Sequence, residues 1–255
     1  GEQVTVHDEG SARAIPPVMK TVSASDLAPD SAKIHAEIVH AGGRNVTDRG
    51  IIYWPYDGED KEMGDSVVID ISQAGSFEKG VFSLTIEDLD INTHYNYRSY
   101  ANNGVIRGFG GIGYGETMDF WTLANIPDAP TVEATSPTSI TLTINPNGNP
   151  ASVQYAVYES NIGKYLDYNK LSRYPDYNNP FSVDTVWFSI EFGATFGIEY
   201  LSPSTEYSFK VKARNGGLIE TEFGPEAGAT TLEGSSIHSG NMVDIDIFPN
   251  PVGNV

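Results

Sequence analysis

The sequence predicts an all-β protein made of two tandem, antiparallel, Greek-key β-sandwiches. Short segments with strand-like alternation are separated by turn residues, one longer pattern occurs twice, and both copies lead to a Thr-Leu pair. A chain of 255 residues has room for two such domains of about 100 residues each, with additional segments at both ends. We therefore expect two cores, one for each copy of the repeated pattern.

The repeated pattern places Leu, Thr, Tyr, a second aromatic residue, Ala and Asn at matching positions. The first copy runs from Leu89 to Asn103, and the second begins 112 residues later and runs from Leu201 to Asn215. It is typical of a tyrosine corner, in which a turn delivers a tyrosine to a strand and the hydroxyl bonds to backbone just upstream. Tyr95 and Tyr207 are the predicted corner residues.

The composition argues against several kinds of binding partner and chemistry. The formal net charge is −19, so the chain repels phosphate backbones and anionic surfaces, and nucleic-acid binding is not expected. The absence of cysteine removes thiolate metal sites, thiol catalysis and disulfides. No apolar run has the length of a membrane span, so membrane insertion is not expected either.

The first domain is predicted over residues 16–123. Residues 1–15 are interpreted as a linker or as the end of a strand from an upstream domain, and Pro16-Pro17 marks the start of the sandwich. The strongest alternation is at 32–38, where Ala and Ile occupy every second position. Further strands are expected at 50–54, 67–71, 81–86 and 117–123.

The second domain is predicted over residues 131–232, after a short joint at 124–130 that two prolines make semi-rigid. Strands are expected at 139–144 and 153–158, and a hairpin turns at Gly216-Gly217. Between them lies an aromatic-rich insertion at 158–188.

A family resemblance follows from these segments. The second domain combines Pro127-Asp128-Ala129-Pro130, the strand 139–143 and the alternation of Leu201, Pro203, Thr205, Tyr207, Phe209, Val211, Ala213 and Asn215. It resembles a fibronectin type III domain, and the first domain resembles one more loosely. Ile144 stands where that family usually has a tryptophan, so we expect the core to be packed differently there.

The C-terminal segment suggests an export route. Residues 233–242 are interpreted as a flexible linker, and 243–255 begin an alternating strand that ends in Phe248-Pro249-Asn250-Pro251. This resembles the truncated start of the C-terminal sorting domain of type IX secretion cargo. The resemblance implies a bacterial protein that is extracellular or on the cell surface and engages the secretion machinery through this tail. It also implies O-glycosylation at Asp-Ser/Thr-aliphatic triplets, here at Ser31, Ser66 and Thr185.

No catalytic, cofactor or metal site is predicted. The glycines of 108–113 fit a dinucleotide fingerprint, but they join two expected antiparallel strands and no helix follows. The acidic loop 57–65 lacks the register of a calcium loop, and the histidines have no metal-binding spacing.

The insertion in the second domain gives the alternative function. Flat rings beside amides and carboxylates suit sugar binding, whereas the same rings also serve as internal packing for a long connection. The candidate ligand-binding residues are Tyr165, Tyr168, Tyr174, Tyr177 and Trp187. The expected role is a non-catalytic spacer or interaction module that binds another surface protein, and the alternative is a carbohydrate-binding module accessory to an upstream hydrolase.

Overall fold

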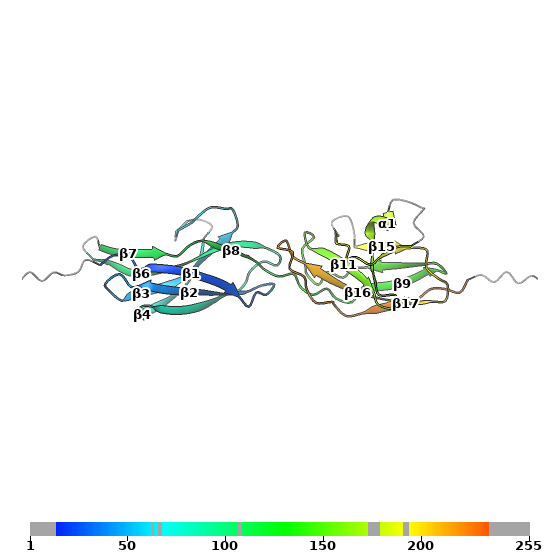
Figure 1. Cartoon of the computed structure of the whole chain (residues 1–255), viewed down its shortest axis with the longest axis horizontal. Helices are drawn as coiled ribbons and strands as arrows, with labels where there is room; N and C mark the ends of the chain where they lie inside the picture. Colours follow the sequence, from blue (N-terminus) through cyan, green and yellow to red (C-terminus); the bar gives the residue numbers. More distant parts are fainter. Residues whose placement is uncertain are drawn as a thin grey trace, which may run out of the picture.

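The computed structural model describes residues 14–234, apart from residue 63 and the ranges 66–67, 107–108, 173–178 and 191–193. Two β-sandwiches lie end to end along the long axis of the molecule, with β1 to β8 in one and β9 to β17 in the other (Figure 1). The predicted all-β class with two antiparallel sandwiches is confirmed.

The first sandwich pairs a three-stranded sheet with a five-stranded one. The smaller sheet has the order β1-β2-β5, and the larger one has the order β4-β3-β6-β7, with β8 pairing the start of β6. The strands are β1 (Val18–Ser25), β2 (Ala32–His40), β3 (Val46–Pro55), β4 (Ile69–Phe77), β5 (Gly80–Ile86), β6 (His94–Ile106), β7 (Phe109–Tyr114) and β8 (Met118–Trp121).

The second sandwich repeats this plan and adds the insertion. Its smaller sheet has the order β15-β10-β9, and its larger one has the order β13-β12-β11-β16-β17, with β14 pairing β11. The elements are β9 (Thr131–Ser136), β10 (Ser139–Thr143), β11 (Gln154–Glu159), β12 (Lys164–Leu166), α1 (Tyr168–Ser172), β13 (Phe181–Ser182), β14 (Phe188–Ser189), β15 (Thr195–Ile198), β16 (Glu206–Arg214) and β17 (Ala227–Thr230). The insertion therefore supplies β12, β13, β14 and the short helix.

Each sandwich has its own core between its two sheets. The alternation on β2 is confirmed, since Ala32, Ile34, Ala36 and Ile38 are all buried. Ile144, in the position expected for a tryptophan, is also buried. Trp54 lies apart from the main core of the first sandwich, in a small cluster with Ile52 and Tyr100.

The glycine-rich hairpin joins antiparallel strands. β6 and β7 are paired from Tyr100 with Tyr114 to Ile106 with Phe109, and β7 leads to β8 rather than to a helix. A dinucleotide site of the kind that needs a helix N-terminus is therefore not formed by these glycines.

Candidate functional site

Both tyrosine corners have the same hydrogen bond. The Tyr95 hydroxyl accepts from the backbone N–H of Asp90 at 3.1 Å, and the Tyr207 hydroxyl accepts from that of Ser202 at 2.9 Å. Both rings are buried, and each tyrosine bonds to the residue five positions before it. Each corner thus fixes the turn that precedes β6 or β16.

A threonine from the end of each sandwich closes the corner. Thr122 Oγ1 accepts from Thr93 N–H at 2.8 Å and donates to the Asp90 carbonyl at 2.7 Å. Thr231 Oγ1 accepts from Thr205 N–H at 3.0 Å and donates to the Ser202 carbonyl at 2.6 Å. The Thr-Leu pair that ends each repeat in the sequence is therefore part of the corner itself.

The two corners differ at one turn position. Asn92 and Ser204 both have a positive φ, +53° and +50°, a conformation that asparagine tolerates better than most residues. The Asn92 side chain reaches the second sandwich, where its Oδ1 accepts from Gly216 N–H at 2.6 Å and its Nδ2 donates to Ser152 Oγ at 2.9 Å. The first corner is thus also a contact between the sandwiches.

A second asparagine, from the second sandwich, forms a hydrogen bond to the first. Asn215, which ends the second copy of the repeat, is buried, and its Nδ2 donates to the Thr122 carbonyl at 2.9 Å. Its Oδ1 accepts from Ile219 N–H at 2.8 Å, which fixes the hairpin after β16. The carboxamide therefore connects that hairpin to the residue that directly follows β8 of the first sandwich.

Trp121 packs directly on this hairpin. A Cβ on Gly216 would overlap the six-membered ring of Trp121, and a Cβ on Gly217 would lie 2.9 Å from its Cδ1. Only glycine permits so close an approach of the backbone to the ring. The sequence indicated the Gly216-Gly217 pair only as a turn. In the structure this pair is also the surface on which a tryptophan of the other sandwich packs.

The tryptophan is held in place by a stack of rings. His94 stacks on Trp121 with centroids 4.8 Å apart, and Tyr56 stacks on His94 at 3.9 Å. His94 Nε2 lies 2.8 Å from Asp119 Oδ2. We refer to Asn92, His94, Trp121, Asn215 and the Gly216-Gly217 pair as the junction.

The connecting segment is bound along its length by a turn of the second sandwich. Asn125 N–H donates to Asn149 Oδ1 at 2.7 Å, and Asn149 Nδ2 donates back to the Asn125 carbonyl at 2.8 Å. Asn147 Nδ2 donates to the Ile126 carbonyl at 3.0 Å. The prolines suggested a semi-rigid joint, and these amide hydrogen bonds give it a specific path.

The outer face of the larger sheet in the second sandwich carries rings alternating with cations. Arg214 lies over Trp187 at 4.5 Å, and Lys210 lies over Phe223 at 4.8 Å. Between them, Lys212 lies within 5.4 Å of the centroids of three rings, those of Tyr165, Trp187 and Phe223. We call this set, with Tyr158, the aromatic–cation face.

The three cations of this face have different partners. Lys212 Nζ lies 2.6 Å from Glu220 Oε2. Burial is the largest single influence on the pKa of Lys212 and lowers it, but the interactions with Glu220 and Tyr165 together outweigh burial, so the pKa is raised. Arg214 Nε donates to the neutral amide of Gln154 at 2.7 Å. Within the described part of the chain, neither Lys210 nor Arg214 forms an ion pair with a carboxylate.

The predicted ligand-binding residues separate into three groups. Tyr165 and Trp187 belong to the aromatic–cation face, whereas Tyr168 stacks on Phe188 at 5.2 Å and packs against the core. Tyr174 and Tyr177 lie outside the described residues. Sequence reasoning missed Phe223 and the cations, because they come from β16 and the segment after it rather than from the insertion.

The acidic loop is organised by its own side chains. Asp57 accepts from Trp54 Nε1 at 3.3 Å and from Glu59 N–H at 3.0 Å, and Lys61 Nζ lies 2.7 Å from its other oxygen. The hydrogen bond to Lys61 and the one from Glu59 lower the pKa of Asp57. Over the described ranges, no three His, Asp or Glu side chains converge as a metal-binding group.

The predicted modification and sorting residues are only partly described. Ser31 and Thr185 are half-buried, and the Ser31 carbonyl accepts from Ala28 N–H at 2.9 Å. Ser66 and Phe248, Pro249, Asn250 and Pro251 lie outside the described residues. No helix in the described part of the chain is long and apolar enough to cross a membrane.

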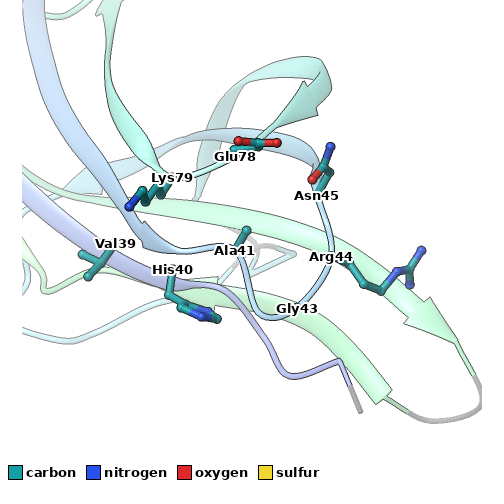
Figure 2. A pocket seen from close by; sticks show the side chains of 8 residues that line it. All are labelled: Val39, His40, Ala41, Gly43, Arg44, Asn45, Glu78 and Lys79. Carbon is teal, nitrogen blue, oxygen red and sulfur yellow. The ribbon is translucent and has the colours of Figure 1, made fainter. Parts of the chain in front are cut away.

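A shallow hollow of about 330 Å³ lies at the end of the first sandwich that holds the β2–β3 loop (Figure 2). Val39 and His40 from β2 line it together with Glu78 and Lys79 from the β4–β5 turn. His40 Nδ1 accepts from Gly42 N–H at 2.9 Å, so the ring takes part in the local turn. The lining mixes both signs of charge and offers no catalytic grouping.

Comparison with known proteins agrees with this architecture. No protein-family model and no curated protein matches the chain. Among solved structures, a two-domain fibronectin type III segment from chicken tenascin matches with a TM-score of 0.52 at 13% identity, over 84% of this chain and 99% of that one. At this identity the likeness concerns the fold. The chain consists of two tandem fibronectin type III-like β-sandwiches.

Proposed function

We propose that the two sandwiches form a non-catalytic module that holds neighbouring parts of a longer exported protein at a set distance and angle. Separate domains in one chain are expected to move relative to each other unless their interface restrains them. Here the junction supplies side-chain hydrogen bonds and a ring packed on glycines, and the connecting segment beside it is bound by a turn of the second sandwich. This combination is the observation that carries the proposal.

The absence of cysteine makes the proposal directly testable. Thr85→Cys and Thr131→Cys place two unique spin labels on exposed strand positions, one in each sandwich. Double electron–electron resonance should give one narrow distance distribution. The same labels with Trp121→Ala should give a broader one, and with Ser204→Ala an unchanged one. A broad distribution in the unmodified junction would refute a spacer of fixed geometry.

Export is a second part of the proposal. The support is the Phe248-Pro249-Asn250-Pro251 pattern after a flexible linker, which resembles the start of a type IX sorting domain. The location would be extracellular or at the cell surface, and the secretion machinery would be a partner. Secretion of the natural protein should fail when these four residues are replaced by alanine, and undiminished secretion would refute this route.

A carbohydrate-binding module is the alternative, and the aromatic–cation face is the observation that favours it. Tyr165 and Trp187, both indicated by the sequence, lie on this face with Lys212 between their rings. Affinity electrophoresis of the whole chain in gels containing polysaccharides would test it. Retardation that Tyr165→Ala or Trp187→Ala abolishes would support the alternative, and mobility unchanged in every polysaccharide would exclude it.

A further inference from the structure

The strand β16 presents its cations in one line. Its burial alternates, so Lys210, Lys212 and Arg214 share the outer face while Phe209, Val211 and Ala213 face the core. Neighbouring β11 sets Tyr158 opposite Lys210 and Gln154 opposite Arg214. Because a strand advances by about 3.3 Å per residue, the backbone positions of Lys210 and Arg214 are about 13 Å apart.

The rings on this face are already engaged. Trp187 and Phe223 each have a cation over the ring, and Tyr158 contacts Tyr165 edge-on at 5.0 Å. A neutral sugar needs a free ring face for stacking, and these contacts restrict that mode. The groups that remain available to a ligand are the outer ends of the cations and the ring edges.

The charges are unevenly compensated. Glu220 neutralises Lys212, whereas within the described residues Lys210 and Arg214 contact rings and a neutral amide and form no ion pair with a carboxylate. The chain as a whole carries a net charge of −19, so a row of three cations on one strand face contrasts with its overall acidity. Rings beside a cation displace water from it and strengthen its attraction to an anion.

We propose that the aromatic–cation face binds a carboxylated polysaccharide, with Arg214 engaging one uronate carboxylate and Lys210 another further along the chain. A planar guanidinium suits a carboxylate, because two parallel N–H···O bonds can form. Nucleic acid is the less suitable polyanion, since its phosphates are more closely spaced than one carboxylate per sugar and therefore meet a stronger repulsion from the acidic protein. This inference rests on the alternative, carbohydrate-binding function, and it names the ligand class and two residues that the sequence did not indicate.

The test uses polygalacturonate as the probe and the whole chain as the protein. Titration calorimetry in low salt should show binding that Lys210→Gln with Arg214→Gln weakens at least tenfold. Lys33→Gln is the control, because Lys33 is a half-buried strand lysine on the first sandwich, paired with Asp26, and its replacement should leave the affinity unchanged. Thermal unfolding of each variant shows whether the fold is retained.

A second variant changes the affinity in the opposite direction. Glu220→Gln frees Lys212 from its carboxylate partner, so binding of polygalacturonate should tighten severalfold. Its opposite sign separates a ligand effect from a general loss of stability. If Glu220→Gln instead leaves the affinity unchanged, Lys212 does not face the ligand and the assigned face is wrong.

The remaining outcomes are each decisive. No binding of polygalacturonate, equal weakening by Lys33→Gln, or equally tight binding of single-stranded DNA would overturn the inference. Binding of neutral glucan or xylan without polygalacturonate would also overturn it, but it would leave the carbohydrate-binding function standing. The failure of this inference is therefore distinguishable from the failure of that function.

Discussion

The Tyr95 corner and the Tyr207 corner are built alike but perform different tasks. Both join a buried tyrosine to a backbone N–H and are closed by a buried threonine. Among the described residues, the first corner also contacts the other sandwich, through Asn92, which occupies the position of Ser204 in the second corner, whereas Ser204 makes no such contact. A stabilising arrangement that occurs in both sandwiches can thus also become a domain contact through one side chain in its turn.

The surroundings of the corners complete the difference. The strand after the first corner, β6, pairs with β8, which ends in Trp121, and this ring packs on the Gly216-Gly217 hairpin of the second sandwich. The corresponding strand of the second sandwich, β17, ends in Thr230. The corner therefore stabilises each sandwich, while the residues around it, here Asn92 and Trp121, determine whether the two sandwiches contact each other.

The largest expected effect on the relative position of the sandwiches is at Gly216, on which Trp121 packs. Gly216→Ala forces its Cβ into the Trp121 ring, and overpacking of this kind costs about 3 kcal/mol unless the contact opens. We expect the contact to open, because Gly216 lies at an exposed hairpin. Spin-label distances between Thr85→Cys and Thr131→Cys should broaden.

Gly197→Ala is the control for this substitution. Nothing lies within 4 Å of a Cβ at Gly197, and its φ is not in the left-handed region, so distances should stay narrow. If Gly216→Ala also gives a narrow distance distribution, the packing of Trp121 on Gly216 does not determine how the two sandwiches are placed relative to each other.

The next effect tests whether the corners are equivalent. Thr122→Val and Thr231→Val each remove a buried hydroxyl that both accepts and donates a hydrogen bond, at a cost of about 2 kcal/mol. Urea unfolding should show a similar loss of free energy of unfolding for the sandwich that carries the change. A loss in only one of the two would show that the corners are not energetically alike.

A smaller effect distinguishes the two turn positions. Asn92→Ala removes two hydrogen bonds across the junction and should weaken the coupling of the sandwiches by about 1 kcal/mol. Ser204→Ala at the matching position should leave the coupling unchanged. Differential scanning calorimetry of both variants would detect a separation of two unfolding transitions, expected for Asn92→Ala alone.

The smallest expected effect is on the stability of the first sandwich at acidic pH, and it distinguishes the first sandwich from the second. The pKa of Asp57 is lowered, chiefly by its bond to Lys61, so it lies below the unfolded value. The stabilisation from this group is therefore present above the unfolded pKa and is lost as the pH falls through the folded pKa. In the second sandwich, the buried Glu159 instead accepts from the backbone N–H groups of Ser208 and Ile162.

Acid titration of unfolding free energy measures this difference. Asp57→Asn should reduce the loss of stability of the first sandwich between neutral and strongly acidic pH, whereas Asp60→Asn in the same exposed loop should not. An unchanged acid response in Asp57→Asn would contradict the role assigned to the bond with Lys61.

The sequence predicted what depends on local pattern. The corner tyrosines, the alternation on β2 and the Thr-Leu endings are short-range signals, and they lead to the correct fold class. The junction was not predictable in this way, because Asn92 and Gly216 are 124 residues apart and the glycines alone indicate only a turn. Its contacts exist only once both sandwiches have formed.

The aromatic–cation face shows the same limit. The aromatic insertion was noticed, but Tyr168 begins the short helix α1 and packs on Phe188 and the core. The cations enter the face through the pairing of β11 with β16, and Phe223 enters from a segment beyond the second corner. Which rings meet which charges is a consequence of strand register, and composition does not contain it.

The most direct test of the account is whether the sandwiches move as one body. Residual dipolar couplings of backbone N–H groups in the ¹⁵N-labelled chain report the orientation of each sandwich in the same weakly aligned sample. The account predicts that couplings from residues of β1 to β8 and of β9 to β17 fit one shared alignment tensor. Two tensors that differ in magnitude and orientation would contradict a fixed junction.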